Sequence, residues 1–303
     1  MNDVTTILGS AIRLFGPLAF AGSGEYVAER SGTLNISIEA MMLAGAFFSI
    51  YGANVTGSIV LGLVFGMVAG LVVAAIHANF SHRLSANTFV VGIALNVFVL
   101  GITSFLTETE KNHLDPRQAK TLKIPFFHDL DIVGKSIFTN RWPIYLLVIV
   151  IPLSWWIVQR TRWGLEVRAS GEDPIAADVT GIDVNKRRRQ TMYYCGLMSG
   201  LGGAYYALGE VGQFNTNMTA GRGFIVNAAV IFGGWTLFGT IGGCFLFGAA
   251  DALRLALPAL GYTITPQVLI AAPYVLALLA MLLFAKRARK PAALAQPFER
   301  SST

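Results

Sequence analysis

Charged residues are scarce in this sequence. Asp, Glu, Lys and Arg together make up 13% of the chain, whereas 54% of its 303 residues are hydrophobic. A soluble domain carries about 25% charged residues, because its surface must contact water. The deficit excludes an ordinary soluble globular protein and implies that most of the surface faces hydrocarbon. The 32 glycines agree with this, because small residues let helices approach one another closely in lipid.

Residues for catalysis and metal binding are also few. The two cysteines, Cys195 and Cys244, each lie within an apolar segment, where a free thiol acts as a small hydrophobe. The four histidines show no metal-ligand spacing. The string at 134–136 resembles the end of a phosphate-binding loop, but Asp129 occupies the position where that motif requires Gly. We therefore expect no enzyme activity, metal or cofactor in this chain.

The net charge of +6 has a location that argues against nucleic-acid binding. Its dense clusters, at 186–189 and 286–290, lie just outside apolar segments. Basic clusters in that position are typical of cytoplasmic loops beside anionic lipid. We therefore expect a lipid bilayer, and no nucleic acid, as a partner.

Several apolar segments are long enough to cross a bilayer, which takes about 20 helical residues. A further apolar stretch, 224–257, is interrupted by glycines and is too short for two full crossings, so it predicts a short or re-entrant helix followed by a full one. The fold class is thus an all-α integral membrane protein, a polytopic bundle of about 8–9 membrane segments. One transmembrane domain covers 1–290, and a tail covers 291–303. The full-length segments lie at 8–28, 36–54, 57–79, 86–107, 142–160, 190–211 and 265–285.

Charge sets the orientation. The tail after residue 284 and the loop 161–189 are rich in Lys and Arg, so both should be cytoplasmic by the positive-inside rule. Each span carries the chain to the other side of the membrane, so the number of spans between two loops decides whether they share a side. Segment 190–211 therefore ends outside, and 265–285 must begin outside to finish in the cytoplasm. The stretch 224–257 between them must then begin and end outside, in agreement with its glycine break. The same parity puts the N-terminus outside, and also the loop 108–141, although that loop is fairly basic.

Two segments share a glycine-rich pattern. The stretch that begins at Asn35 resembles the stretch that begins at Asn227, and the two would enter the membrane from opposite sides. An inverted repeat of this kind places a transport path at the interface of the repeats. Glycine-rich helices that resemble each other by chance would give the same pattern.

Polar residues inside the predicted spans are costly in lipid unless they face a wet cavity or a partner. Amide and carboxylate groups beside apolar walls suit sugar hydroxyls and base edges. The alternative is that Glu39 and Asp251 pair with cations such as Arg13 or Arg254 and only tie helices together. The candidates for a solute path are Asn35, Glu39, Asn87, Asn96, Glu210, Asn227 and Asp251.

The cytoplasmic loop contains a local helix signal. Asp173 is a good N-cap, Pro174 suits the first helical position and Gly181 can end the helix. A helix from about 174 to 180 would place Ile175 and Val179 on one side, at positions i and i+4. Such a helix suits docking into a groove of a partner protein. The alternative is a helix that lies passively on the lipid headgroups.

Three ordered segments resemble a known family. They are similar to the signatures of ABC importer permeases of the nucleoside and simple-sugar branch, related to the branched-chain amino acid and ribose-like importers, and specifically of the shorter permease type. The segments are 24–43 (GEYVAERSGTLNISIEAMML), 164–182 (GLEVRASGEDPIAADVTGI) and 218–233, which contains MTAGRGFI and AAVIFG.

The resemblance implies a permease subunit in the bacterial inner membrane. Its implied partners are a second permease, two cytoplasmic ATPases that bind ATP and Mg²⁺, and an extracytoplasmic substrate-binding protein. Without the resemblance, an ion-coupled secondary transporter using Glu39 or Asp251 and a passive channel would remain open. The coupling role carries over onto Gly171, Glu172, Asp173, Pro174, Ile175, Ala176, Ala177, Asp178, Val179 and Gly181.

Overall fold

The computed structural model describes residues 3–110, 114–123, 138–259, 271, 275 and 289–298. Six helical segments in these ranges are long and apolar enough to cross a membrane. The predicted span 265–285 lies outside the described ranges, apart from two single positions. The six segments are Ile7–Arg30, Ile38–Thr56, Ile59–His82, Thr88–Thr109, Trp142–Arg160 and Leu237–Leu257.

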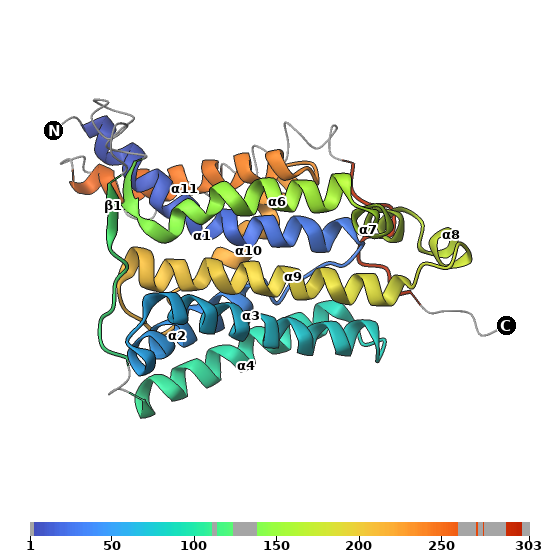
Figure 1. Cartoon of the computed structure of the whole chain (residues 1–303), viewed down its shortest axis with the longest axis horizontal. Helices are drawn as coiled ribbons and strands as arrows, with labels where there is room; N and C mark the ends of the chain where they lie inside the picture. Colours follow the sequence, from blue (N-terminus) through green and yellow to red (C-terminus); the bar gives the residue numbers. More distant parts are fainter. Residues whose placement is uncertain are drawn as a thin grey trace.

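The helices form one elongated bundle whose members run roughly along its long axis (Figure 1). Short helices α7 and α8 lie at one end, together with the segment 289–298, and α1 begins at the other end (Figure 1). The elements are α1 (Asp3–Arg30), α2 (Ile38–Thr56), α3 (Ile59–His82), α4 (Thr88–Thr109), β1 (Thr121–Lys123), β2 (Thr139–Arg141), η2 (Trp142–Leu146), α6 (Leu147–Arg160), α7 (Arg162–Glu172), α8 (Pro174–Val179), α9 (Val184–Tyr205), η3 (Tyr206–Val211), α10 (Arg222–Phe232) and α11 (Leu237–Ala259).

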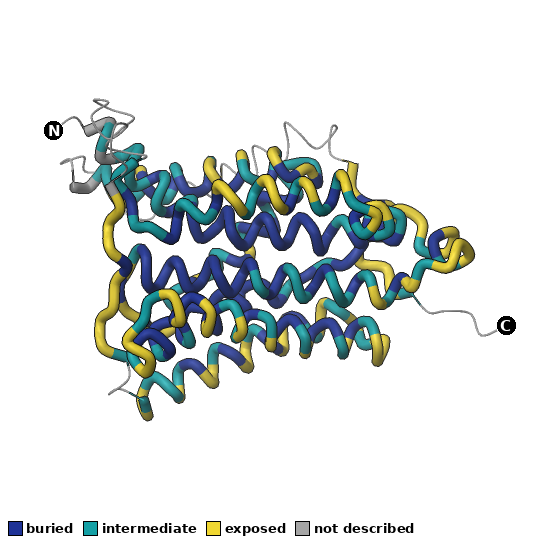
Figure 2. Tube along the Cα trace, viewed as in Figure 1, coloured by how far each residue is buried: buried dark blue, intermediate teal, exposed yellow. Residues whose placement is uncertain are grey.

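Helix α9 runs through the buried centre of the bundle, between α1 and the pair α2–α3 (Figure 2). Glycines make this close packing geometrically feasible. A Cβ added at Gly200 would collide with the backbone of α3 at Gly66, and one added at Gly203 would collide with the carbonyl of Met42 in α2. Small residues at such crossings allow van der Waals contact between backbones in lipid, where no hydrophobic force drives helices together.

The stretch 224–257 folds as its sequence predicts, into a short helix followed by a full-length one. Helix α10 has 11 residues and α11 has 23. At a rise of 1.5 Å per residue, α10 is about 16 Å long, roughly half of a hydrocarbon core of about 30 Å. The turn between them uses two residues with positive φ, Gly234 and Trp235.

Two small features were not predicted from the sequence, and the first of them departs from the all-α fold. Strands β1 and β2 pair antiparallel, with Leu122 opposite Asn140, within the loop that charge and parity place outside. The loop 161–189 also contains a second helix, α7, before α8. Both features are short, and neither has the apolar length that made the membrane spans predictable.

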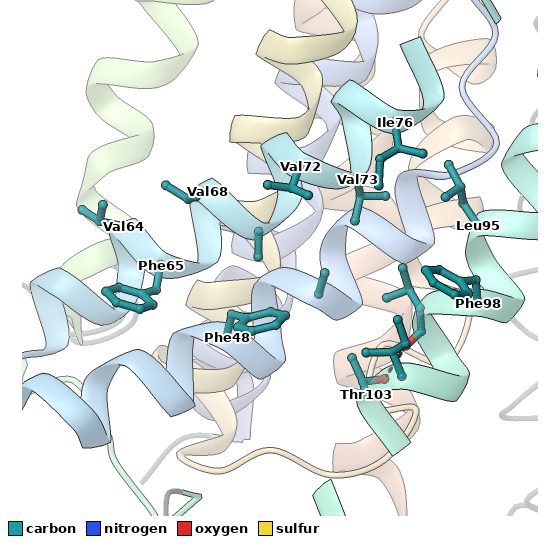
Figure 3. Close-up of a pocket in the computed structure, with 14 residues that line it drawn as sticks. Phe48, Val64, Phe65, Val68, Val72, Val73, Ile76, Leu95, Phe98 and Thr103 are labelled. Atoms are coloured by element: carbon teal, nitrogen blue, oxygen red, sulfur yellow. Dashed lines mark hydrogen bonds between the residues drawn. The ribbon is translucent and has the colours of Figure 1, made fainter. Parts of the chain in front are cut away.

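An apolar cavity of about 440 Å³ opens between α2, α3 and α4. Figure 3 shows its wall of valine and phenylalanine side chains, among them Val68, Val72 and Phe98, with Thr103 at one edge. Such a surface offers almost no hydrogen-bonding groups, whereas a polar solute needs them. This cavity therefore does not suit the polar solute that the sequence predicts.

Candidate functional site

The N-terminus of α10 is capped by a side chain from another helix. Its N-cap residue, Gly221, has φ 86° and supplies no side-chain cap. Glu39, in the first turn of α2, takes that role: its Oε1 accepts hydrogen bonds from Thr219 Oγ1 at 2.6 Å and from the Gly221 amide at 2.8 Å, and its Oε2 accepts one from the Gly223 amide at 2.6 Å. A carboxylate at a helix N-terminus is favoured by the helix dipole.

The start of α2 is organised by Asn35. The Oδ1 atom of Asn35 accepts hydrogen bonds from Ser37 N at 3.1 Å and from Ser37 Oγ at 2.9 Å. The backbone carbonyl of Asn35 accepts a hydrogen bond from Asn227 Nδ2 at 3.0 Å. Three predicted path residues, Asn35, Glu39 and Asn227, therefore meet where the first turns of α2 and α10 approach each other. The Oδ1 atom of Asn227 is buried and has no hydrogen-bond partner among the described residues.

Two buried acids of α1 support this region. Glu25 accepts hydrogen bonds from Asn35 Nδ2 at 2.9 Å and from Cys195 Sγ at 3.2 Å. Glu29, one helical turn further along, accepts a hydrogen bond from Trp235 Nε1 in the turn after α10. Both glutamates are fully buried. They connect α1 to the segment before α2 and to the turn between α10 and α11.

A line of buried polar side chains leads away from Asn35. Ser37 Oγ, which donates to Asn35, lies 2.6 Å from His77 Nδ1 in α3. His77 Nε2 lies 2.8 Å from the hydroxyl of Thr88, at the start of α4. The Thr88 hydroxyl also donates to the carbonyl of Leu34 at 3.1 Å. Ser37, His77 and Thr88 form what we call the polar file. Its members were missed in the sequence, because single polar residues in apolar runs do not reveal which helices they join.

The four remaining predicted path residues have structural partners, and three of them lie away from the start of α2. Asn96 fastens α4 to the start of α2, through the carbonyl of Ile36 and the amide of Ala40. Asn87 is exposed and caps α4. Glu210 pairs with Arg13 at 3.6 Å, and Asp251 pairs with Arg222 at 2.8 Å and with Arg254 at 2.7 Å.

These ion pairs partly match the alternative drawn from the sequence. Asp251 does pair with Arg254. Glu39, in contrast, hydrogen-bonds to the N-terminus of α10, and Arg13 pairs with Glu210 instead.

Helix α8 has the structure that its sequence predicts. The Asp173 carboxylate accepts a hydrogen bond from the Ala176 amide at 3.0 Å, and Gly181 follows the helix with φ 89°. Ile175 and Val179 are 71% and 82% exposed. An apolar edge with this exposure, on a helix at the end of the molecule (Figures 1 and 2), is available to a partner.

The coupling segment is fixed to the bundle on its inner side. Gly171 and Ala177 are buried, and the other residues of the predicted coupling set are exposed or half-buried. Arg187 of α9 pairs with Glu166 of α7. Arg30, the last residue of α1, lies 3.8 Å from the Glu172 carboxylate. These two ion pairs connect α7 to the ends of α1 and α9.

Comparison with a solved structure agrees with this architecture. PsaBC from Streptococcus pneumoniae in complex with Fab aligns with a TM-score of 0.52 over 93% of this chain and 91% of that chain. The sequence identity is 14%, so the likeness concerns the fold alone.

Sequence comparisons extend over nearly the whole chain. The chain is 33% identical to the guanosine ABC transporter permease protein NupQ of Bacillus subtilis (strain 168), over 97% of each protein. It is 31% identical to the nucleoside ABC transporter permease protein NupC of Lactococcus lactis subsp. cremoris, over 97% of this chain and 96% of that protein. Residues 7–285 match the family described as "Branched-chain amino acid transport system / permease component". The protein is therefore a membrane permease that belongs to this family.

Proposed function

We propose that this chain is a permease subunit of an ATP-driven importer and that it moves nucleosides across the inner membrane, with simple sugars as the second choice of solute. The observation that carries the proposal is α8, a capped helix whose apolar edge is exposed at the end of the molecule. The names of NupQ and NupC, which match along almost their full length, support nucleosides as the solute.

Asn35, Glu39 and Asn227 are the proposed lining of the solute path. They lie where two helices begin within the bundle, an arrangement that transporters use to direct helix N-termini at a solute. The Asn227 Oδ1 atom is buried without a partner among the described residues, so it can accept a hydrogen bond from a ribose hydroxyl or a base N–H group. Unsatisfied buried acceptors are costly, which favours binding of a donor.

The coupling step starts at α8. A partner ATPase that closes on ATP would push on Ile175 and Val179, and α7 would transmit the motion to α1 and α9 through the Glu172–Arg30 and Glu166–Arg187 pairs. Two ATPase subunits would bind ATP and Mg²⁺. A second permease of a different type would complete the membrane unit, and an extracytoplasmic binding protein would deliver the solute. The C-terminus would be cytoplasmic, the N-terminus periplasmic, and 1–290 a single permease domain.

The test replaces the apolar edge of α8 and leaves its cap intact. Ile175→Ser should lower ATP-dependent uptake by at least about tenfold, the equivalent of about 1.4 kcal/mol of lost docking energy. Exposed side chains rarely affect folding, so membrane insertion should be unchanged. Leu165→Ser on α7, where the side chain is 60% exposed, is the matched control and should transport normally.

The complex itself supplies the second readout. The parent chain should co-purify with an ATPase, and the Ile175→Ser variant should retain less of it. Normal uptake and normal ATPase recovery in that variant would refute the coupling assignment. Calorimetry on the associated binding protein tests the solute, and tight binding of an amino acid in place of a nucleoside would overturn that part.

A further inference from the structure

The segment 289–298, which we call the C-terminal strap, lies across the end of the bundle that carries α7 and α8 (Figure 1). Its backbone bonds to two other segments: the Ala293 amide donates to the carbonyl of Gly171 at 2.9 Å, and the Ala295 amide donates to the carbonyl of Gly32 at 3.0 Å. Ala293 is only 3% exposed. The strap is thus packed against the bundle, and one of its contacts is the first residue of the predicted coupling set.

Arg188 fastens the strap to the helix ends. This arginine is 1% exposed, although it lies in a run of four basic residues. Its Nη1 atom donates to the carbonyl of Gln296 at 2.7 Å, its Nε to that of Ser31 at 3.1 Å, and its Nη2 to that of Ser170 at 3.5 Å. Ser31 follows the end of α1, and Ser170 lies in the last turn of α7.

The charge of Arg188 is balanced in an unusual way. Within the described ranges it has no carboxylate partner, and a buried charge normally requires one. Carbonyl groups at helix C-termini carry partial negative charge and stabilise a cation. Arg188 can bond to the ends of α1 and α7 and to the strap at the same time only while these three segments keep their present relative positions.

A small polar cavity of about 60 Å³ lies beneath the strap. Thr88, the outer member of the polar file, lines this cavity, and the file leads from there through His77 and Ser37 to Asn35. The proposed solute path and the strap are thus joined by continuous polar side chains. Other lining residues are Thr33, Ser81, His82, Arg188 and Gln296.

We propose that the C-terminal strap, latched by Arg188, closes the cytoplasmic end of the solute path and is released when α7 and α8 are displaced. The inference rests on the proposed function for its direction and its trigger. Arg188 is a positioning residue here, because it acts through carbonyl groups and not through the solute. Displacement of α7 would move the carbonyls of Ser170 and Gly171 together, and so would break one strap contact and one latch contact at once.

Two adjacent alanines provide a direct test in the reconstituted complex. In Ala293→Cys the thiol is covered, and in Ala292→Cys it is exposed. A maleimide should therefore label Ala293→Cys about tenfold more slowly than Ala292→Cys without nucleotide, because labelling needs local opening. Trapping the ATPases with ATP and vanadate should remove most of that difference. The native cysteines are both buried and give the background rate. If Ala293→Cys is labelled as slowly after trapping as before it, the proposed release of the strap is overturned.

Variants of Arg188 test the latch without any partner. Lysine keeps the charge but cannot reach three carbonyl groups with one planar fork. In the purified chain, a maleimide should label the Ala293→Cys thiol several-fold faster when Arg188→Lys or Arg188→Gln is also present than in Ala293→Cys alone. The control is Arg189→Lys, because Arg189 makes no hydrogen bond to the strap among the described residues. Equal labelling rates of the Ala293→Cys thiol in all three variants would overturn the latch.

Transport separates the two proposals. Arg188→Lys should lower the amount of solute moved per ATP hydrolysed, and an unchanged ratio would refute the closure role. Loss of ATP-driven uptake in the parent chain would refute the proposed function instead, and the labelling of the purified chain would still decide whether Arg188 latches the strap.

Discussion

Removing the charge of Glu39 should loosen α10 from the rest of the bundle. In Glu39→Gln one carboxylate oxygen becomes an NH₂ group, so at least one of the three donors, Thr219 Oγ1 and the amides of Gly221 and Gly223, loses its acceptor. A buried donor left unsatisfied costs about 1–3 kcal/mol. The lost attraction between the carboxylate and the helix N-terminus adds about 1 kcal/mol. The free energy of unfolding should thus fall by about 2–4 kcal/mol.

The chain carries its own reporter for this experiment. Its two cysteines are both buried, so a dye that fluoresces on reaction with thiols follows unfolding on heating. The midpoint of Glu39→Gln should fall by about 3–6 °C for a chain of this length. Asp115→Asn makes the same change from carboxylate to amide at an exposed position and should shift the midpoint by about 1 °C or less. Equal midpoints for the two variants would refute the capping role of Glu39.

Two further substitutions test the packing by the same thermal assay. Gly203→Ala should destabilise the chain strongly, because its Cβ would collide with a backbone carbonyl of α2. In the control, Gly101→Ala, the added Cβ meets no atom within 4 Å, so this change should be neutral or stabilising. Similar thermal midpoints for the two variants would contradict the packing of α9. Trp235→Phe removes the donor to the buried Glu29 and should cost about 1–3 kcal/mol, while Trp156→Phe, at a site 54% exposed, should cost less than about 0.5 kcal/mol. Equal losses in the two tryptophan variants would count against the Glu29 contact.

The features that the sequence predicted well are local. The signals for α8 lie within nine residues, from Asp173 to Gly181, and each acts on the backbone beside it. Six candidate membrane spans were predictable for a similar reason, because length and hydropathy are properties of one segment. The predicted span 190–211, most of which lies in α9, is not among those six. The glycine break and the limited length of 224–257 together predicted the short helix α10 followed by α11.

The features that the sequence did not predict depend on distant partners. Glu39 caps a helix that begins more than 180 positions later, and no local pattern shows such a contact. The sequence placed Arg188 in a basic cluster of a cytoplasmic loop beside anionic lipid. A signal was present, because Arg188, Thr191, Met192 and Cys195 share one buried face of α9 at positions i, i+3, i+4 and i+7, but reading it requires knowing that α9 is central.

Uptake into proteoliposomes with the energy source controlled tests the central claim most directly. With the second permease, the partner ATPases and the binding protein present, a nucleoside should accumulate against its gradient only when ATP is supplied, and Ile175→Ser should abolish most of that accumulation. The purified chain alone should accumulate nothing in a proton or sodium gradient. Uphill uptake by the chain alone, driven by either ion, would contradict the claim that nucleotide turnover in other subunits drives transport through α8.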